Sequence, residues 1–186
     1  SLVIQAKKRI EDISNKEGLS GVATGFDKLD LLTSGWQPSD LVIIAARPGM
    51  GKTALTLSMA RNIAVLKKTP VAFFSLEMSS VQLITRLISA ETGLTSEKLR
   101  TGKLESHEWE QLNVKVGDLE KAPLYIDDSP SLSIFDLRAK ARRLSSKHGI
   151  QLIIVDYLQL MTSGTASKTG NREQEISSIS RNLKAL

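Results

Sequence analysis

Four short runs of apolar residues interrupt the chain of 186 residues. Each run is nearly continuous rather than alternating and is rich in β-branched or aromatic side chains, which is typical of strands that are covered on both faces. The predicted strands lie at 41–46 (LVIIAA), 71–77 (VAFFSLE), 123–128 (PLYIDD) and 151–160 (QLIIVDYLQL). Strands of this kind indicate a parallel sheet with other elements packed on both faces.

Helical patterns separate these runs. Apolar residues recur at helical spacing in 53–68 and in 133–149, and the second segment has a serine cap signal at Ser133 and a glycine stop signal at Gly149. Strands that alternate with helices predict an α/β fold with a mainly parallel central sheet flanked by helices. In such sheets, ligands bind at the carboxyl ends of the strands. The length suits one domain, for which we predict the bounds 18–186.

The two flanks differ from this core. Residues 1–17 are charged and amphipathic, with Leu2, Ile10 and Ile13 among basic and acidic side chains, and the segment KEGLSGV separates them from the rest. We predict a linker helix there that docks on another surface. Residues 162–172 (TSGTASKTGNR) are small and polar and include glycine, which predicts a mobile loop. The helical pattern at RNLKAL meets no glycine cap or proline, so we expect the natural protein to continue.

Charge and composition narrow the class of protein. The 25 lysines and arginines against 20 acidic residues give a net charge of +5, which favours an anionic partner without requiring one. The chain has no cysteine, so disulfides and thiolate metal sites are excluded. No apolar run approaches the roughly 18 residues that a membrane span needs, and the N-terminus has no signal-peptide core. We therefore expect a soluble, cytoplasmic protein without a membrane partner.

The stretch AARPGMGKTAL (45–55) follows the first predicted strand and opens the first predicted helix. Gly49 and Gly51 allow backbone N–H groups to approach phosphate oxygens closely, and the N-terminal end of the helix adds positive potential. Lys52 would reach the β- and γ-phosphates of a nucleotide, and the Thr53 hydroxyl would bind Mg²⁺. The pattern G-x-x-x-x-G-K-[ST] is met except at its first position, where alanine replaces glycine. The predicted nucleotide-binding residues are Ala46, Arg47, Pro48, Gly49, Met50, Gly51, Lys52, Thr53 and Ala54.

Carboxylates end the other predicted strands. Asp156 ends LIIV, where it would face the phosphate loop and act on Mg²⁺ through the direct ligands of the ion. Glu77 ends AFFSL, where it could orient and deprotonate the attacking water, which makes it, with Lys52, a candidate catalytic residue. A solvated charge at a strand end is the alternative for both carboxylates. Asp127 and Asp128 also end a strand, and for them we expect a capping or structural role, since one water-activating carboxylate is enough.

Nucleic-acid contact has two candidate segments. The basic run in 138–148 (RAKARRLSSKH) is more typical of a solvated helix face. The polar loop with Lys168 and Arg172 is the better candidate, because small residues let the backbone pack against phosphates that the two cations attract. Aromatic residues make up only 4% of the chain, which argues against a base-stacking platform for single strands. His107 and Trp109 lie in a polar segment and fit surface or helix-packing positions.

Several segments together resemble one family. The motifs are TGFDKLD, SDLVIIAARPGMGKTA, FSLEMS, KLRTG, YIDD, RAKARRL, VDYLQL and NREQEISSISRNLKAL, and they cover nearly the whole chain. They are similar to the ATPase domain of the bacterial hexameric replicative DNA helicases of the DnaB type. The resemblance implies a RecA-like P-loop NTPase fold, ATP and Mg²⁺ as cofactors, and translocation on single-stranded DNA by a six-membered ring. It also implies a primase and a helicase loader as partners.

The same resemblance assigns roles to individual residues. Lys52 and Thr53 belong to the phosphate loop. Glu77 is then the catalytic carboxylate and Asp156 the metal-side aspartate, while residues 1–17 are the linker helix that packs on the neighbouring subunit.

The family also has parts that this sequence lacks. It continues past LKAL with a strand that lies between the phosphate-loop strand and the strand of Asp156, and with basic residues that reach the adjacent subunit's nucleotide. It also has an N-terminal domain. We therefore expect a gap in the centre of the sheet, and a fragment that binds nucleotide but does not unwind DNA alone.

Three alternatives to a helicase motor stay open. A RecA- or RadA-type recombinase or a circadian-clock-type ATPase would share the nucleotide site, although SLEMS and DYLQL favour the helicase. A nucleotide-dependent assembly module would use ATP to join subunits, so it would keep its function after Glu77→Gln, whereas a motor would lose DNA movement while still binding ATP. A DNA-binding ring component or loader would keep its DNA affinity and function after Lys52→Ala.

Overall fold

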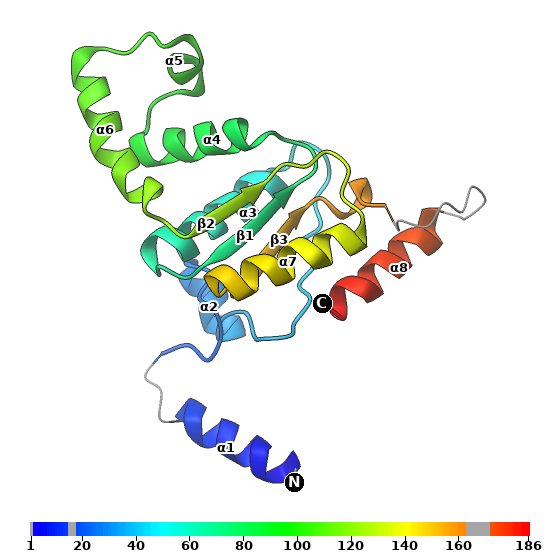
Figure 1. Ribbon diagram of the computed structural model, residues 1–186. Helices are drawn as coiled ribbons and strands as arrows, with labels where there is room; N and C mark the ends of the chain where they lie inside the picture. The colour runs from blue at the N-terminus through cyan, green and yellow to red at the C-terminus, as the bar shows by residue number, and fades with distance from the viewer. Residues whose placement is uncertain (1, 15–17, 163–171) are drawn as a thin grey trace.

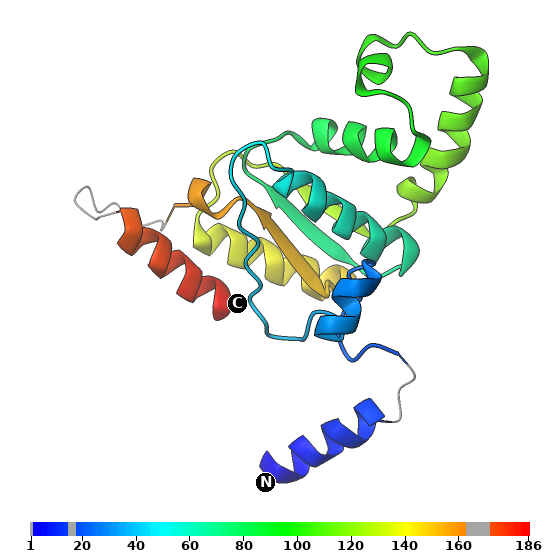
Figure 2. The ribbon, with the colours of Figure 1, turned by 180° about the vertical axis from the view of Figure 1, so that it is seen from behind.

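The computed structural model describes residues 2–14, 18–162 and 172–186. Helices surround a sheet of parallel strands (Figures 1 and 2). In chain order the elements are α1 (Leu2–Ser14), α2 (Asp27–Thr33), α3 (Lys52–Arg61), η1 (Asn62–Leu66), β1 (Val71–Ser75), α4 (Ser80–Thr92), α5 (Ser96–Thr101), α6 (Ser106–Glu120), β2 (Leu124–Asp127), α7 (Ile134–His148), β3 (Leu152–Asp156), η2 (Leu158–Leu160) and α8 (Arg172–Lys184). Here η1 is a π-helical turn that continues α3, and η2 is a 3₁₀ turn. This is the α/β architecture that the alternation of strand and helix patterns predicts.

The central strand of the described sheet is β1. The strand order is β2-β1-β3 with both pairings parallel, and Val71 pairs with Leu124 on one side and with Leu152 on the other. All five β1 residues are buried. Phe73 faces a core built with α3, η1, α4 and α6, whereas Phe74 faces a second core built with α7 and α8. The sheet is thus packed on both faces, as the continuous apolar pattern predicts.

Local signals determine where the helices begin and end. The backbone N–H of Asp136 donates to the Ser133 hydroxyl, and the backbone N–H of Ser133 donates to the Asp136 carboxylate, so the pair forms a capping box before α7. Gly149 ends this helix in the left-handed conformation, with φ of 65°. Ser79 and Gln82 form the same box at the start of α4. The helix that the sequence predicts between the serine and glycine signals is therefore confirmed.

The prediction of a strand at 41–46 is wrong, because this segment forms no strand in the structure. A strand forms only when ladder hydrogen bonds pair it with a neighbour, and 41–46 has no such neighbour within the described part of the chain. There β3 is paired on one side only, with β1. A cavity of about 1390 Å³ is lined by both 41–46 and β3 and extends to α3, α7 and α8. Val42 and Ile43 consequently remain 43% and 70% exposed. The cavity occupies the place where the resemblance to the helicase family implies a gap in the sheet.

Helix α1 stands apart from the rest of the molecule (Figures 1 and 2). The helix predicted within residues 1–17 is observed over Leu2–Ser14. Its apolar side chains Leu2, Val3, Ile4 and Ile10 are between 67% and 84% exposed, and the side chain of Ile13 lies outside the described part. Neither α1 nor any other described helix is long and apolar enough to cross a membrane.

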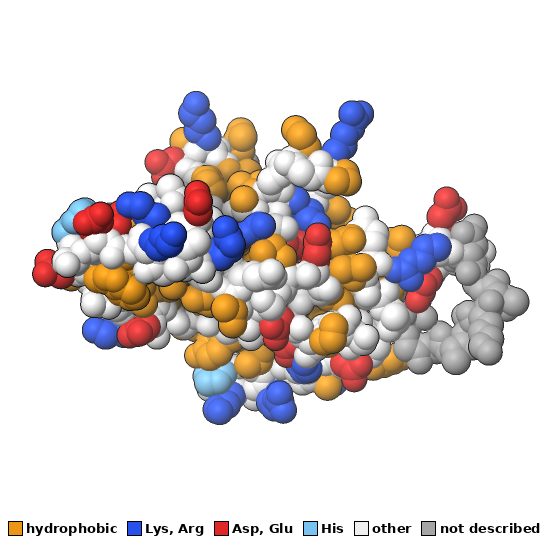
Figure 3. Space-filling view, turned by 90° about the horizontal axis from the view of Figure 1, so that it is seen from above, with side chains coloured by type: hydrophobic (Ala, Val, Ile, Leu, Met, Phe, Trp, Pro, Cys, Tyr) orange, Lys and Arg blue, Asp and Glu red, His pale blue; other side chains and the backbone are white. Residues whose placement is uncertain are grey.

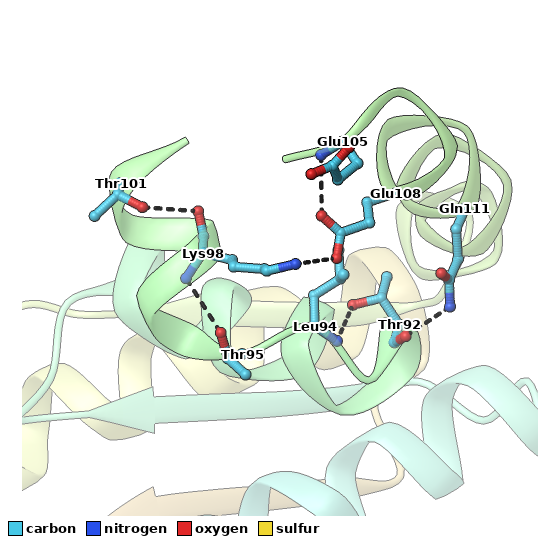
Figure 4. A network of polar contacts seen from close by, with 8 residues as sticks. All are labelled: Thr92, Leu94, Thr95, Lys98, Thr101, Glu105, Glu108 and Gln111. Carbon is cyan, nitrogen blue, oxygen red and sulfur yellow. Dashed lines mark hydrogen bonds and ion pairs between the residues drawn. The ribbon is translucent and has the colours of Figure 1, made fainter. Parts of the chain in front are cut away.

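The segment α4–α5–α6 forms an arm that packs on the sheet through α4 and the end of α6 and whose α5 end projects away from it (Figure 1). Figure 4 shows the polar contacts that hold its parts together. Lys98 on α5 donates from Nζ to the buried carboxylate of Glu108 on α6 at 2.5 Å, and the backbone N–H of Glu105 donates to the same carboxylate at 3.0 Å. Gln111 donates from Nε2 to the carbonyl of Thr92 at 2.8 Å, which ties α6 to the end of α4. The hydrogen bond from Lys98, followed by that from the Glu105 backbone, lowers the pKa of Glu108.

Candidate functional site

The predicted phosphate loop, residues 46–54, includes the first three residues of α3, and Gly51 caps this helix. Gly49 and Gly51 have φ of 77° and 85°, in the left-handed region that favours glycine. An added Cβ at either glycine would meet no atom within 4 Å, so the backbone conformation rather than crowding requires glycine there. Met50 between them is 73% exposed. The loop thus presents bare backbone to open space at the N-terminal end of α3, which suits the binding of an anion.

Thr53 and Asp156, the two residues predicted to hold Mg²⁺, contact each other. The hydroxyl of Thr53 donates to Oδ2 of Asp156 at 2.6 Å, although 103 positions separate the two residues in the chain. Thr53 lies in the first turn of α3, and Asp156 is the buried last residue of β3. Lys52 Nζ lies 2.9 Å from Oδ1 of Asp156, which is an ion-pair distance. This Oδ1 is buried, and no described donor is aligned for a hydrogen bond to it, so the Lys52 ammonium is its charged neighbour.

The ring of Tyr157 is the second neighbour of Lys52. The ammonium Nζ lies 3.9 Å from the ring centroid, within the range of a cation–π interaction. Tyr157 is half-buried and follows Asp156 through a cis peptide bond. This tyrosine was not among the predicted site residues, because an aromatic residue at a strand end is more often a packing residue and carries no signal of its own.

The predicted catalytic residue Glu77 lines the same cavity as Lys52 and Thr53. It lies two residues beyond the end of β1, and its side chain is exposed. Arg86, an exposed residue of α4, lines this cavity as well and was not predicted, because a single arginine on an amphipathic helix gives no signal in the sequence. The carboxyl ends of β1 and β3 and the start of α3 thus bring together the residues that the sequence proposes for nucleotide chemistry.

The two remaining strand-end carboxylates have structural partners. Lys140 donates from Nζ to Oδ2 of Asp127 at 2.6 Å, and the backbone N–H of Ser80 at the start of α4 donates to Oδ2 of Asp128 at 2.7 Å. Burial alone would raise the pKa of Asp127, but the hydrogen bonds from Lys140 and Ser129 outweigh it and lower the pKa. The backbone hydrogen bond from Ser80 lowers the pKa of Asp128. The expected capping and structural roles are therefore observed.

The structure describes only one of the two residues that are predicted to contact nucleic acid. Lys168 lies outside the described residues. Arg172 is the first residue of α8 rather than the end of a loop, and its guanidinium pairs with Glu175 and donates to the carbonyls of Gln159 and Met161. On the face seen in Figure 3, cationic side chains of the described residues are mixed with acidic and hydrophobic ones and form no continuous patch. Contact of these two cations with nucleic acid remains a prediction.

Comparison with known proteins points to one family. The sequence matches the family model of the DnaB-like helicase C-terminal domain over residues 21–186. It is 48% identical to the replicative DNA helicase DnaB of Geobacillus stearothermophilus and 43% identical to the replicative DNA helicase DnaC of Bacillus subtilis. Each similarity covers 100% of this chain and 41% of the relative. The chain therefore spans well under half the length of these two helicases.

Solved structures give the same result for the fold. A DnaB-like replicative helicase, described together with its interactions with primase, superposes with a TM-score of 0.89 at 32% sequence identity. That similarity covers 98% of this chain and 44% of the other. A second solved ATPase domain gives the same TM-score and identity over 99% of this chain and 64% of the other. The three described strands and their helices therefore have the arrangement of these ATPase domains.

Proposed function

Because the chain belongs to the family of DnaB-like helicase C-terminal domains, we propose that it is part of the motor domain of a replicative DNA helicase. In the whole protein, this domain couples ATP hydrolysis to translocation on single-stranded DNA and to duplex unwinding at the replication fork. The observation that carries the proposal is the 2.6 Å contact between the Thr53 hydroxyl and Asp156, beside Lys52. It joins the phosphate loop to the metal-side carboxylate in one site.

The oxygen atoms at this site fit Mg²⁺. Magnesium prefers hard oxygen ligands and is usually bound through one or two protein groups together with phosphates and water. The Thr53 hydroxyl and the Asp156 carboxylate supply such oxygens, and Oδ1 of Asp156 lacks an aligned donor. We therefore assign Thr53 and Asp156 as the residues that would hold Mg²⁺. When bound there, the ion would neutralise charge on the nucleotide phosphates.

The remaining residues act on the nucleotide directly. Backbone N–H groups of 46–54 and the N-terminal end of α3 bind the phosphate oxygens. Lys52 exchanges its ion pair with Asp156 for the β- and γ-phosphates, which places a positive charge where negative charge develops during transfer. Glu77 orients the attacking water and accepts its proton, so that the oxygen of the water becomes bonded to the γ-phosphorus as ADP leaves. Lys52 and Glu77 are therefore the proposed catalytic residues.

The cavity beside β3 leads us to propose that this chain binds nucleotide but does not unwind DNA by itself. A further strand between 41–46 and β3 would complete both hydrogen-bond ladders and cover Val42 and Ile43. We propose that the whole protein supplies this strand. Robust unwinding by the 186-residue chain alone would contradict this part of the proposal.

Assembly and partners follow from the helicase assignment. We propose that the whole protein forms a hexameric ring in the cytoplasm, in which α1 packs on the neighbouring subunit through its exposed apolar side chains. A primase and a helicase loader are proposed partners. Lys168 and Arg172 are the proposed contacts to single-stranded DNA, and salt-dependent loss of DNA affinity in variants of these two residues would test them.

The first experiment is a titration of a fluorescent ATP analogue into this chain with and without Mg²⁺. We expect Mg²⁺-dependent binding in the wild-type chain and none in Lys52→Ala. Lys67→Ala is the matched control, because Lys67 is an exposed lysine beyond the end of α3. Equal affinity in the wild-type chain and Lys52→Ala would contradict the assignment of the phosphate loop.

A further inference from the structure

The Lys52 ammonium has two partners of different chemistry. Oδ1 of Asp156 lies 2.9 Å from Nζ and belongs to a carboxylate, whereas the centroid of the Tyr157 ring lies 3.9 Å from Nζ and the ring is neutral. The Lys52 side chain is 24% exposed, so the ammonium is largely but not fully removed from water. A ring face attracts a cation more strongly when water is partly excluded in this way.

We propose that Tyr157 is a positioning residue of the nucleotide site. Its ring holds the Lys52 ammonium beside the phosphate loop before a nucleotide binds. This inference rests on the proposed function, because it assigns Tyr157 a role toward the lysine that would contact the phosphates.

Asp156 has competing partners at this site. This carboxylate accepts the Thr53 hydroxyl through Oδ2 and pairs with Lys52 through Oδ1. A metal ion that binds at Thr53 and Asp156 competes with Lys52 for the same carboxylate, so the ammonium must give up that ion pair. The neutral ring of Tyr157 does not bind a metal ion. It can therefore keep its contact with the Lys52 ammonium while phosphates replace the Asp156 carboxylate as the other partner of that ammonium.

The conformational freedom of the Lys52 side chain opposes nucleotide binding. A lysine side chain has four rotatable bonds, and holding it in one conformation costs entropy at the moment of binding. Tyr157 directly follows the last residue of β3 and is half-buried, so its backbone starts from a paired strand and part of its side chain is packed. A ring held in this position orders the ammonium in the free protein, so less freedom is lost when the nucleotide arrives. The contact that the structure shows for Lys52 is with the ring of Tyr157, so we assign the role to the ring.

The geometry can be tested without any nucleotide. A cation above a ring face places its neighbouring methylene protons in the ring current, so the ε-methylene protons of Lys52 are expected at higher field than those of other lysines. The measurement is a proton–carbon NMR spectrum of the chain with ¹³C-labelled lysine, with the Lys52 signal identified by its loss in Lys52→Arg. We expect the shift to persist in Tyr157→Phe and to disappear in Tyr157→Leu. Absence of the shift in the wild-type chain would overturn the proposal, whatever the variants do.

The effect on binding is tested by titration of Mg²⁺ and the ATP analogue into the same proteins. We expect Tyr157→Leu to weaken affinity by roughly two- to tenfold, the range for ordering one flexible side chain, and Tyr157→Phe to bind like the wild-type chain. Thermal unfolding supplies the structural control, and we expect Tyr157→Leu to unfold at nearly the same temperature as Tyr157→Phe and the wild-type chain. Weakened affinity in Tyr157→Leu together with a clear loss of thermal stability would show a merely structural role and overturn the proposal.

The two proposals can fail separately. A wild-type chain that binds nucleotide with the same affinity as Tyr157→Leu contradicts the positioning role alone. A wild-type chain that shows the ring-current shift but binds no nucleotide contradicts the proposed function and, with it, the role of Tyr157 toward phosphates.

Discussion

The hydroxyl of Thr53 lies 2.6 Å from Oδ2 of Asp156 and joins the start of α3 to the end of β3. Among the described strands, none lies between β3 and the segment that precedes α3, and a cavity is lined by both. The phosphate loop and the metal-side carboxylate are therefore held together by side chains, Lys52 and Thr53 on one side and Asp156 on the other.

Thr53→Val should remove most of the effect of Mg²⁺ on nucleotide affinity. Valine has nearly the shape of threonine but no oxygen, so both the metal ligand and the hydrogen bond to Asp156 are lost. We expect the Mg²⁺-dependent part of the affinity to fall roughly tenfold or more, as is common when a partner in a metal site is removed. The measurement compares titrations in Mg²⁺ and in EDTA. Thr53→Ser keeps the hydroxyl and should behave like the wild-type chain, and an unchanged Mg²⁺ effect in Thr53→Val would refute the assigned ligand.

Glu77→Gln should slow ATP hydrolysis without weakening ATP binding. The amide keeps the size of the side chain but cannot accept a proton from water. In the whole helicase, we expect hydrolysis to fall by about 10²- to 10⁴-fold while ATP affinity stays within about twofold. DNA movement should be lost in parallel. If the variant instead kept its cellular function with hydrolysis abolished, the nucleotide would serve assembly and the motor assignment would be wrong.

Glu108→Gln should destabilise the α4–α5–α6 arm in a pH-dependent manner. The folded-state pKa of Glu108 is lowered from 4.5, mainly by the hydrogen bond from Lys98. The ionised carboxylate therefore contributes stability above the unfolded-state pKa, and this contribution is lost as the pH falls through the lower folded-state pKa. Urea unfolding should show a stability difference between the wild-type chain and Glu108→Gln at pH 7 that shrinks toward pH 3. Glu110→Gln, an exposed position on the same helix, is the control.

Two glycine-to-alanine changes should have opposite effects. Gly25 has φ of 78°, and an added Cβ would lie 2.4 Å from the Cβ of Asn62, so Gly25→Ala should cost about 2–4 kcal/mol of folding free energy. Gly117 lies inside α6, and a Cβ there meets nothing within 4 Å. Gly117→Ala should therefore stabilise the chain by about 0.5–1 kcal/mol. Thermal unfolding of both variants checks the pair, and a stabilised Gly25→Ala would show that the loop at this glycine relaxes freely.

Much of the fold could be predicted because its signals are local. Ser133 and Gly149 mark the ends of α7 through hydrogen bonds and backbone conformation that depend on neighbouring residues only. The buried pattern of β1 follows from five consecutive apolar or small residues. The segment 41–46 carries an equally strong pattern and still forms no strand, because pairing needs a neighbour that local sequence cannot supply.

In the candidate site, too, the features with local signals could be predicted and those that depend on distant segments could not. Gly51, Lys52 and Thr53 could be predicted because the phosphate loop is a continuous motif with a known physical purpose. The contacts of Lys52 with Tyr157 and the position of Arg86 beside the cavity could not, since both depend on how distant segments fold against each other. The role of Arg172 as an anchor at the start of α8 was missed for this reason as well.

The unequal pairing of the sheet has a consequence for amide hydrogen exchange. The amides of β1 are buried and lie between two paired strands, so they should exchange with solvent only when the whole domain unfolds. Those of 41–46 have no ladder and should exchange almost as fast as in a free peptide. The segment that carries the phosphate loop is therefore the least protected part of the sheet region, and a partner or added strand that stiffens it would slow its exchange long before the protection of β1 changed.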